Sequence, residues 1–211
     1  MLAPAVLIPL GISGYFAAQL GSDPYSVFVD GVRTVMGITP GMVVIIFNAV
    51  VITLMLFFGR RYLKFGTVFL AMVVGPLIDV FLTLLTGALY FSGEPDLILR
   101  AVVMLCGAVT LSVGIGLLVA IDFGIGTLEW IIILVSKLFK LSVGRAKIVL
   151  DAFLVATGWL MGGLVGVGTV IGIVLTGLLI DVTLKLFANP IKRYVGPLSA
   201  DEANRQKSQN V

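Results

Sequence analysis

The sequence predicts an all-α membrane protein with six transmembrane helices, arranged as two inverted three-helix repeats that each carry a short re-entrant or interfacial helix. Three observations predict this fold: long runs without charge, an internal duplication and an uneven distribution of basic residues. Of the 211 residues, 59% are hydrophobic and 12% are charged, and the mean hydropathy is +1.16. A soluble domain carries about 25% charged residues. The composition therefore excludes an ordinary cytosolic enzyme.

Six apolar segments are long enough to cross a bilayer, because about 20 apolar residues span its core as a helix. The first of them lacks the basic start and the cleavage site of a secretory signal, so we expect it to be retained as a span. The six predicted spans are Leu2–Leu20, Gly41–Phe58, Gly66–Phe91, Leu97–Ile121, Ile148–Val165 and Gly168–Ala188.

Two further helical stretches are too short for a full crossing. Pro24–Met36 opens with Asp23, a good N-cap, and with a proline at the first helical position. Leu128–Leu141 opens after Gly126 and carries Glu129 in its first turn, where the helix dipole favours an acid. Both follow a glycine-rich break, so we expect re-entrant or interfacial helices covered by protein or water.

The two halves of the chain repeat one pattern of glycine and polar residues. An offset of 103 places Gly11 on Gly114 and Asn48 on Asp151. After the loss of one residue, an offset of 102 places Asp79 on Asp181. Further matched pairs are Gly21 with Gly124, Thr39 with Ser142, Gly41 with Gly144, Gly59 with Gly162, Gly66 with Gly168 and Gly75 with Gly177.

This duplication divides the chain into a first repeat (1–96), a second repeat (97–188) and a polar basic tail (189–211). Three spans per repeat is an odd number, so the second repeat must enter the membrane upside down. Twelve of the fourteen basic residues then lie on the cytoplasmic side with both termini, and only Arg33 and Arg100 lie outside. An eight-span alternative would place one large basic cluster outside, so the charge rule favours six.

Acids inside predicted spans are the first candidate functional residues, because a charge at membrane depth is costly and often marks a transport pathway. Asp79 and Asp181 each lie thirteen residues into a span, about 20 Å along the helix. Asp151 corresponds to Asn48 in the first repeat. The structural alternatives are an acid bonded to helix-end amides, and an ion pair of Asp151 with Lys147 one turn earlier.

The two matching breaks are the second group of candidates, since broken helices in corresponding positions of two halves point to a transporter site. Asp23 and Glu129 belong to the helix starts, and Tyr25 and Trp130 follow them as ligand platforms or, alternatively, as interface anchors. Plain capped turns are the structural alternative. The expected backbone hinges are Gly21, Gly124, Gly126, Gly75 and Gly177.

Soluble enzyme chemistry finds no support in the sequence. There is no histidine and one cysteine, Cys106, so we expect neither a metal site nor a cofactor. The basic residues form short clusters between apolar runs, which does not indicate nucleic-acid binding. A lipid-modifying enzyme would require a nucleophile beside the buried acids, and none is evident. We therefore expect a protein that is not an enzyme.

An ordered set of motifs resembles the YczE/YitT-like bacterial membrane proteins. The set runs from Leu20-Gly21-x-x-Pro24-Tyr25 through Ile38-Thr39-x-Gly41 and Gly66-Thr67-Val68 to Gly75-x-x-Ile78-Asp79. The second half departs from it, with Thr127 and Leu178 at the places of the two prolines. The resemblance covers residues 10–188 and implies a multi-pass protein of the bacterial inner membrane. It implies little about activity.

These features together favour a small secondary transporter that uses intramembrane acids to move a cation or proton with a small solute. A zwitterion would suit both the acids and the helix N-termini. The alternative is a non-transporting accessory subunit, or the substrate-capturing part of a larger importer. The expected partners are the bilayer and a small molecule or ion. Glycine-rich segments such as Gly168-x-x-x-Gly172 favour packing within the chain, with a homodimer as the alternative.

Overall fold

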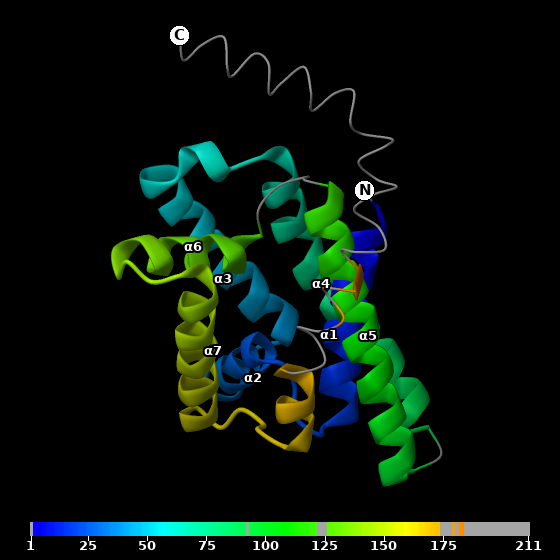
Figure 1. Cartoon of the computed structure of the whole chain (residues 1–211). Helices are drawn as coiled ribbons and strands as arrows, with labels where there is room; N and C mark the ends of the chain where they lie inside the picture. Colours follow the sequence, from blue (N-terminus) through cyan, green and yellow to red (C-terminus); the bar gives the residue numbers. More distant parts are fainter. Residues whose placement is uncertain (1, 92, 122–125, 174–178, 180–181, 184–211) are drawn as a thin grey trace, which may run out of the picture.

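A computed structural model describes residues 2–91, 93–121, 126–173, 179 and 182–183 (Figure 1). Within these ranges the chain forms seven α-helices and one 3-10 helix and has no strand. A further helical stretch covers residues 167–173. The named elements are α1 (Leu2–Ala18), α2 (Pro24–Met36), α3 (Pro40–Phe58), η1 (Arg60–Tyr62), α4 (Phe65–Leu89), α5 (Leu97–Ile121), α6 (Thr127–Leu138) and α7 (Val143–Leu160).

Local capping chemistry sets several of these boundaries. The Asp23 side chain accepts a hydrogen bond from the Ser26 amide and starts α2, with Pro24 at the first helical position. Gly37 ends α2 in the left-handed conformation at φ 65°. Thr39 caps α3 and Ser142 caps α7, each through a bond from the amide three residues later. These short-range signals explain why α2 has the bounds that the sequence predicts.

Three described helices have the length and apolarity of membrane spans: Pro40–Phe58, Phe65–Leu89 and Leu97–Leu118. The prediction of six spans is thus met only in part. Helix α1 is apolar but has 17 residues, about 26 Å of helix. Helix α7 begins at Val143, five residues before the predicted Ile148, and so includes Arg145 and Lys147 in addition to Asp151. Most of the predicted span Gly168–Ala188 lies outside the described residues.

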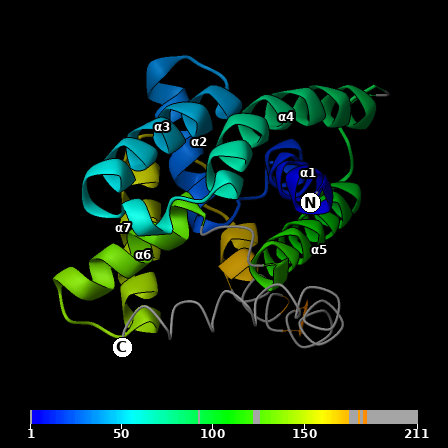
Figure 2. The ribbon, with the colours of Figure 1, turned by 90° about the horizontal axis from the view of Figure 1, so that it is seen from above.

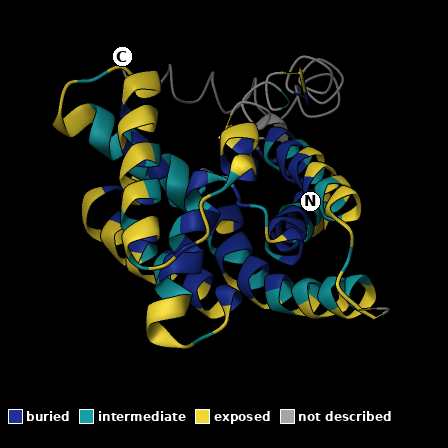
Figure 3. Cartoon of the chain, turned by 90° about the horizontal axis from the view of Figure 1, so that it is seen from below, coloured by how far each residue is buried: buried dark blue, intermediate teal, exposed yellow. Residues whose placement is uncertain are grey.

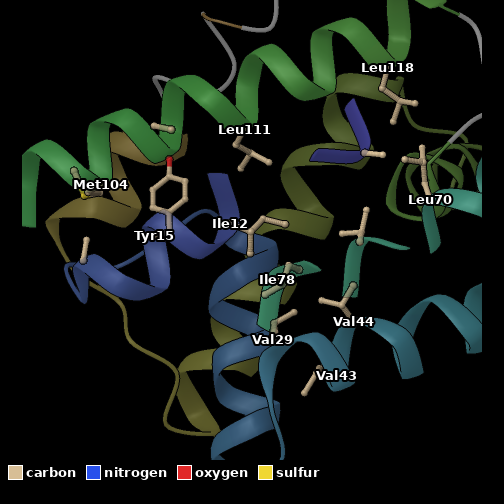
Figure 4. Packing of buried hydrophobic residues seen from close by; sticks show 14 residues of the cluster. Ile12, Tyr15, Val29, Val43, Val44, Leu70, Ile78, Met104, Leu111 and Leu118 are labelled. Carbon is tan, nitrogen blue, oxygen red and sulfur yellow. The ribbon is translucent and has the colours of Figure 1, made fainter. Parts of the chain in front are cut away.

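Helix α1 packs against both α4 and α5, while α2 and α6 pack against α7, and α3 packs against α4 (Figures 1 and 2). The main core cluster joins α1, α2, α3, α4 and α5 through apolar side chains, and a second cluster joins α6 to α7. Figure 4 shows Tyr15 and Ile12 of α1 directed toward α5, beside Met104 and Leu111. Figure 3 shows buried residues on the sides of the helices that face one another and exposed residues on the outer sides. Many of the exposed residues are large and apolar. Such an exterior suits a membrane location.

Glycines bring α1 and α5 into close contact. A Cβ atom added at Gly11 would lie 2.5 Å from the Leu111 amide nitrogen, and one added at Gly114 would lie 3.0 Å from the Ile8 nitrogen. Gly14 likewise meets Gly107. Residues later in α1 contact residues earlier in α5, so the two helices are antiparallel. At the offset of 103, Ile8 corresponds to Leu111 and Gly11 to Gly114, which makes the first two contacts reciprocal.

Helix starts follow the same offsets. Helix α6 begins 103 residues after α2, and α7 begins 103 residues after α3. The helical stretch at 167 begins 102 residues after α4, as expected from the loss of one residue between the motifs. The N-caps Thr39 and Ser142 are also 103 residues apart. These helix starts therefore follow the repeat, whereas α5 begins 95 residues after α1.

Candidate functional site

A cavity of about 140 Å³ lies where the starts of α2 and α6 meet α1, α3, α4 and α5. Its walls are mostly apolar and come from Ile8, Ile12, Val44, Leu70, Leu111 and Ile115 among others. Its polar groups are Asp23, Tyr25, Asn48, Thr67, Thr127 and Glu129. None of the described residues that line it is a lysine or an arginine. Two carboxyl groups thus share an apolar cavity that has no lining cation.

The carboxyl group of Asp23 lies at the N-terminus of α2. One oxygen accepts from the Ser26 hydroxyl at 2.6 Å and the other from the Ser26 amide at 3.4 Å. Burial raises the pKa of Asp23, and the nearby charge of Asp151 acts in the same direction, against the lowering effect of the hydrogen bonds from Ser26. The group therefore holds a proton more readily than a carboxyl group in water.

Glu129 lies in the first turn of α6, in the third helical position after the N-cap Gly126. Its carboxyl group folds back over the first turn and fills the space that a Cβ atom at Gly126 would need. The carboxyl group accepts a hydrogen bond from the backbone amide of Glu129 itself. Burial raises the pKa of Glu129, and the charge of Lys147 opposes that change.

Asn48 connects the two halves across the cavity. Its side-chain oxygen accepts from the Thr127 hydroxyl at 2.7 Å, and its nitrogen donates to the Ala71 carbonyl at 3.4 Å. These two partners determine which atom of the Asn48 amide is the oxygen and which is the nitrogen. Asn48 fixes the start of α6 against α3 and α4, beside both carboxyl groups.

The structure brings together five of the residues predicted from sequence: Asp23, Tyr25, Asn48, Gly126 and Glu129. Thr67 and Thr127 also line the cavity, although sequence reasoning did not select them. Thr67 belongs to the repeated Gly-Thr-Val motif, and Thr127 stands at the start of α6. The sequence contained a signal for each: Thr67 is a polar residue repeated in both halves, and Thr127 follows a glycine-rich break.

Asp79 lies away from this cavity and is half-buried. One of its oxygens accepts from the Gly41 amide at 2.8 Å and the other from the Thr39 hydroxyl at 2.6 Å. It therefore stabilises the N-terminus of α3, which matches the structural alternative. Asp151 forms an ion pair with Lys147, with 2.5 Å between the ammonium nitrogen and a carboxylate oxygen. This ion pair is the structural alternative that the sequence offered for Asp151.

Other predicted residues serve packing. Trp130 is 2% exposed and lies against Gly59, Val51 and Met55, not at the cavity. Gly75 allows α4 to approach Ile45 and Gly41 of α3. Gly21 has φ 96°, a conformation that favours glycine, and lies against Gly166 and Thr169. Asp181, Gly124 and Gly177 lie outside the described residues.

Sequence reasoning also missed Asp30, a buried acid in the middle of α2. It accepts from the Arg33 side chain at 2.6 Å and from the Leu164 amide at 2.7 Å. These bonds tie α2 to the segment after α7. The available signal was an acid three residues before an arginine in the same helix.

Replacing Asp79 by asparagine is expected to lower the free energy of unfolding by about 1–2 kcal/mol, because asparagine cannot accept both bonds with a full charge. Thermal melting in detergent would measure the loss. Glu94→Gln removes the same charge from an exposed loop residue and should leave the melting midpoint unchanged. An unchanged midpoint for Asp79→Asn would contradict the stabilising role of Asp79.

Comparison with known proteins adds a family. Residues 1–185 match the model of a family of unknown function (DUF6198). The chain is 25% identical over 183 residues to the uncharacterized membrane protein YczE of Bacillus subtilis (strain 168), covering 86% of this chain and 82% of that protein. No solved structure matches. The chain belongs to the DUF6198 family of YczE-like membrane proteins.

Proposed function

We propose that the protein is a small secondary transporter that binds one small organic cation between Asp23 and Glu129 and exchanges it for protons. The observation that carries this proposal is the pair of carboxyl groups in an apolar cavity without a lining lysine or arginine among the described residues. A buried carboxylate requires a counter-charge, and a bound cation or proton supplies it.

Asp23 and Glu129 lie at the starts of α2 and α6, two helices that begin 103 residues apart in the repeat. This placement supports a site between two related halves of the chain. Reciprocal, antiparallel contacts of α1 with α5 are those expected of inverted repeats related by a two-fold axis. In the proposed topology six helices cross the bacterial inner membrane, and both termini lie in the cytoplasm. The distribution of lysine and arginine in the sequence supports that orientation.

The occupied helix N-termini favour a cation over the zwitterion considered from sequence. Asp23 already neutralises the start of α2, and the Glu129 carboxyl group lies over the start of α6. An anionic group would have to displace these carboxyl groups. Within the described residues no three Cys, Asp or Glu side chains gather into a metal-binding group. These observations favour a monovalent organic cation with an apolar body.

Cavity size limits that body. A cavity of about 150 Å³ holds benzene, with six heavy atoms, and the cavity here is about 140 Å³. Tetramethylammonium has about that size and keeps its charge at every pH, so it cannot cross lipid as a neutral base. It is therefore a suitable probe for both binding and transport.

Uptake of radiolabelled tetramethylammonium into proteoliposomes with an acidic interior tests the proposal. We expect uptake above that of protein-free liposomes, driven by the pH gradient and abolished when the gradient is dissipated. Tetraethylammonium, which is larger than the cavity, should compete poorly. Binding without uptake would instead favour the substrate-capturing accessory subunit. Absence of both binding and uptake for tetramethylammonium would overturn the cation site.

A further inference from the structure

A second polar feature lies outside the cavity, around Tyr62 in η1. The Tyr62 hydroxyl oxygen accepts from the Arg61 guanidinium at 2.6 Å and from the Lys137 ammonium at 2.8 Å. Both cations also lie near the Tyr62 ring, at 4.7 Å and 5.2 Å from its centroid. We call Arg61, Tyr62 and Lys137 the Tyr62 cluster.

No acidic side chain among the described residues forms an ion pair with the Tyr62 cluster. Among the described residues, the ion pairs are Arg33 with Asp30 and Lys147 with Asp151, and neither involves this cluster. Two cationic nitrogen atoms that share one phenol oxygen are no more than 5.4 Å apart, the sum of 2.6 Å and 2.8 Å. The hydrogen bonds from Lys137 and Arg61 lower the pKa of Tyr62, which lies outside the membrane-spanning helices. A field that stabilises a phenolate also stabilises a phosphate.

Large exposed apolar residues lie close to the cluster residues in the sequence. Phe58 ends α3 and is 74% exposed, Phe65 starts α4 and is 79% exposed, and Leu138 follows Lys137 and is 71% exposed. Exposed aromatic and aliphatic groups next to unpaired cations are expected where a protein meets the boundary between headgroups and acyl chains. A soluble anion would use the cations but would leave this apolar surface without a partner.

We propose that the Tyr62 cluster binds the phosphate of an anionic phospholipid, with Arg61 and Lys137 as the two donors and the neighbouring apolar residues against its acyl chains. Arg61 comes from the first half of the chain and Lys137 from the second, so the lipid phosphate would link η1 to α6. The corresponding loop of the second half, Met161–Val167, carries no charge. This site is therefore confined to one side of the protein, and it does not depend on the proposed transport.

Native mass spectrometry of the full chain, purified in mild detergent with equal phosphatidylglycerol and phosphatidylcholine, tests this proposal. The wild type should retain phosphatidylglycerol preferentially. Each cation near an anionic lipid changes binding by roughly fivefold, so Arg61→Gln with Lys137→Gln should weaken retention by about 25-fold. Equal retention of both lipids by the wild type would overturn the site without any variant.

Two controls separate this site from a general basic surface and from a soluble anion. Lys140→Gln with Arg145→Gln removes two exposed positive charges from neighbouring residues and should leave retention within about twofold. An equal loss in this pair would contradict a specific site. Millimolar inorganic phosphate should not displace the lipid, and complete displacement would show a phosphate site in place of a lipid site. A melting midpoint without added lipid checks that each variant is folded.

Discussion

Substitution of Gly11 by leucine is expected to abolish the folded protein or to lower its free energy of unfolding by about 3 kcal/mol or more. A Cβ atom at this position would lie 2.5 Å from the backbone nitrogen of Leu111, and backbone cannot move aside as a side chain can. Helices α1 and α5 would have to separate, which would open the core around Ile12 and Tyr15. Size-exclusion profiles and thermal melting in detergent would measure the effect.

Gly114→Leu should have a similar effect, because its contact with Ile8 is the reciprocal of the contact between Gly11 and Leu111. Gly87→Leu is the matched control: Gly87 lies in α4, and a Cβ atom there has no neighbour within 4 Å. The control should retain its elution volume and melting midpoint. Wild-type stability in Gly11→Leu would mean that α1 and α5 are not in close contact.

The sequence could predict features that depend on short segments. Asp23, Pro24 and Gly37 set the ends of α2 through local caps, so Pro24–Met36 was predicted to the residue. The repeat offset relates the starts of α6 and α7 to those of α2 and α3, although the predicted span beginning at Ile148 started five residues too late. Both signals lie within a few residues of the boundary that they determine, or in a direct comparison of two segments.

Contacts between distant segments were harder to predict. Depth along a span suggested a pathway role for Asp79, but its actual partners, Thr39 and Gly41, lie about 40 residues earlier in the chain. An aromatic residue after a break suggested a ligand platform or an interface anchor, yet Trp130 is buried against Gly59. Charge, size and spacing do not specify which helix end or glycine will meet such a side chain.

Asp23→Asn combined with Glu129→Gln is expected to weaken tetramethylammonium binding by at least about 100-fold, because a buried charge left without its partner costs about 3–5 kcal/mol and a 100-fold change corresponds to about 2.7 kcal/mol. Folding should survive, since asparagine is as good an N-cap as aspartate and glutamine has nearly the size and shape of glutamate. Titration calorimetry would measure binding, and thermal melting would verify folding. Removal of two exposed acids, Glu94→Gln with Asp96→Asn, should leave the affinity unchanged.

The same pair of carboxyl groups determines the expected dependence on pH. A cation binds the ionised carboxylates, and burial raises the pKa of Asp23 and of Glu129 above their ordinary values of 3.8 and 4.5. Protons therefore compete with the cation above those values, so affinity should rise with pH through the raised pKa values and then become constant. The double variant should show weak binding at every pH. Wild-type affinity that stays constant from pH 4 to pH 8 would mean that these carboxyl groups do not exchange protons for the cation.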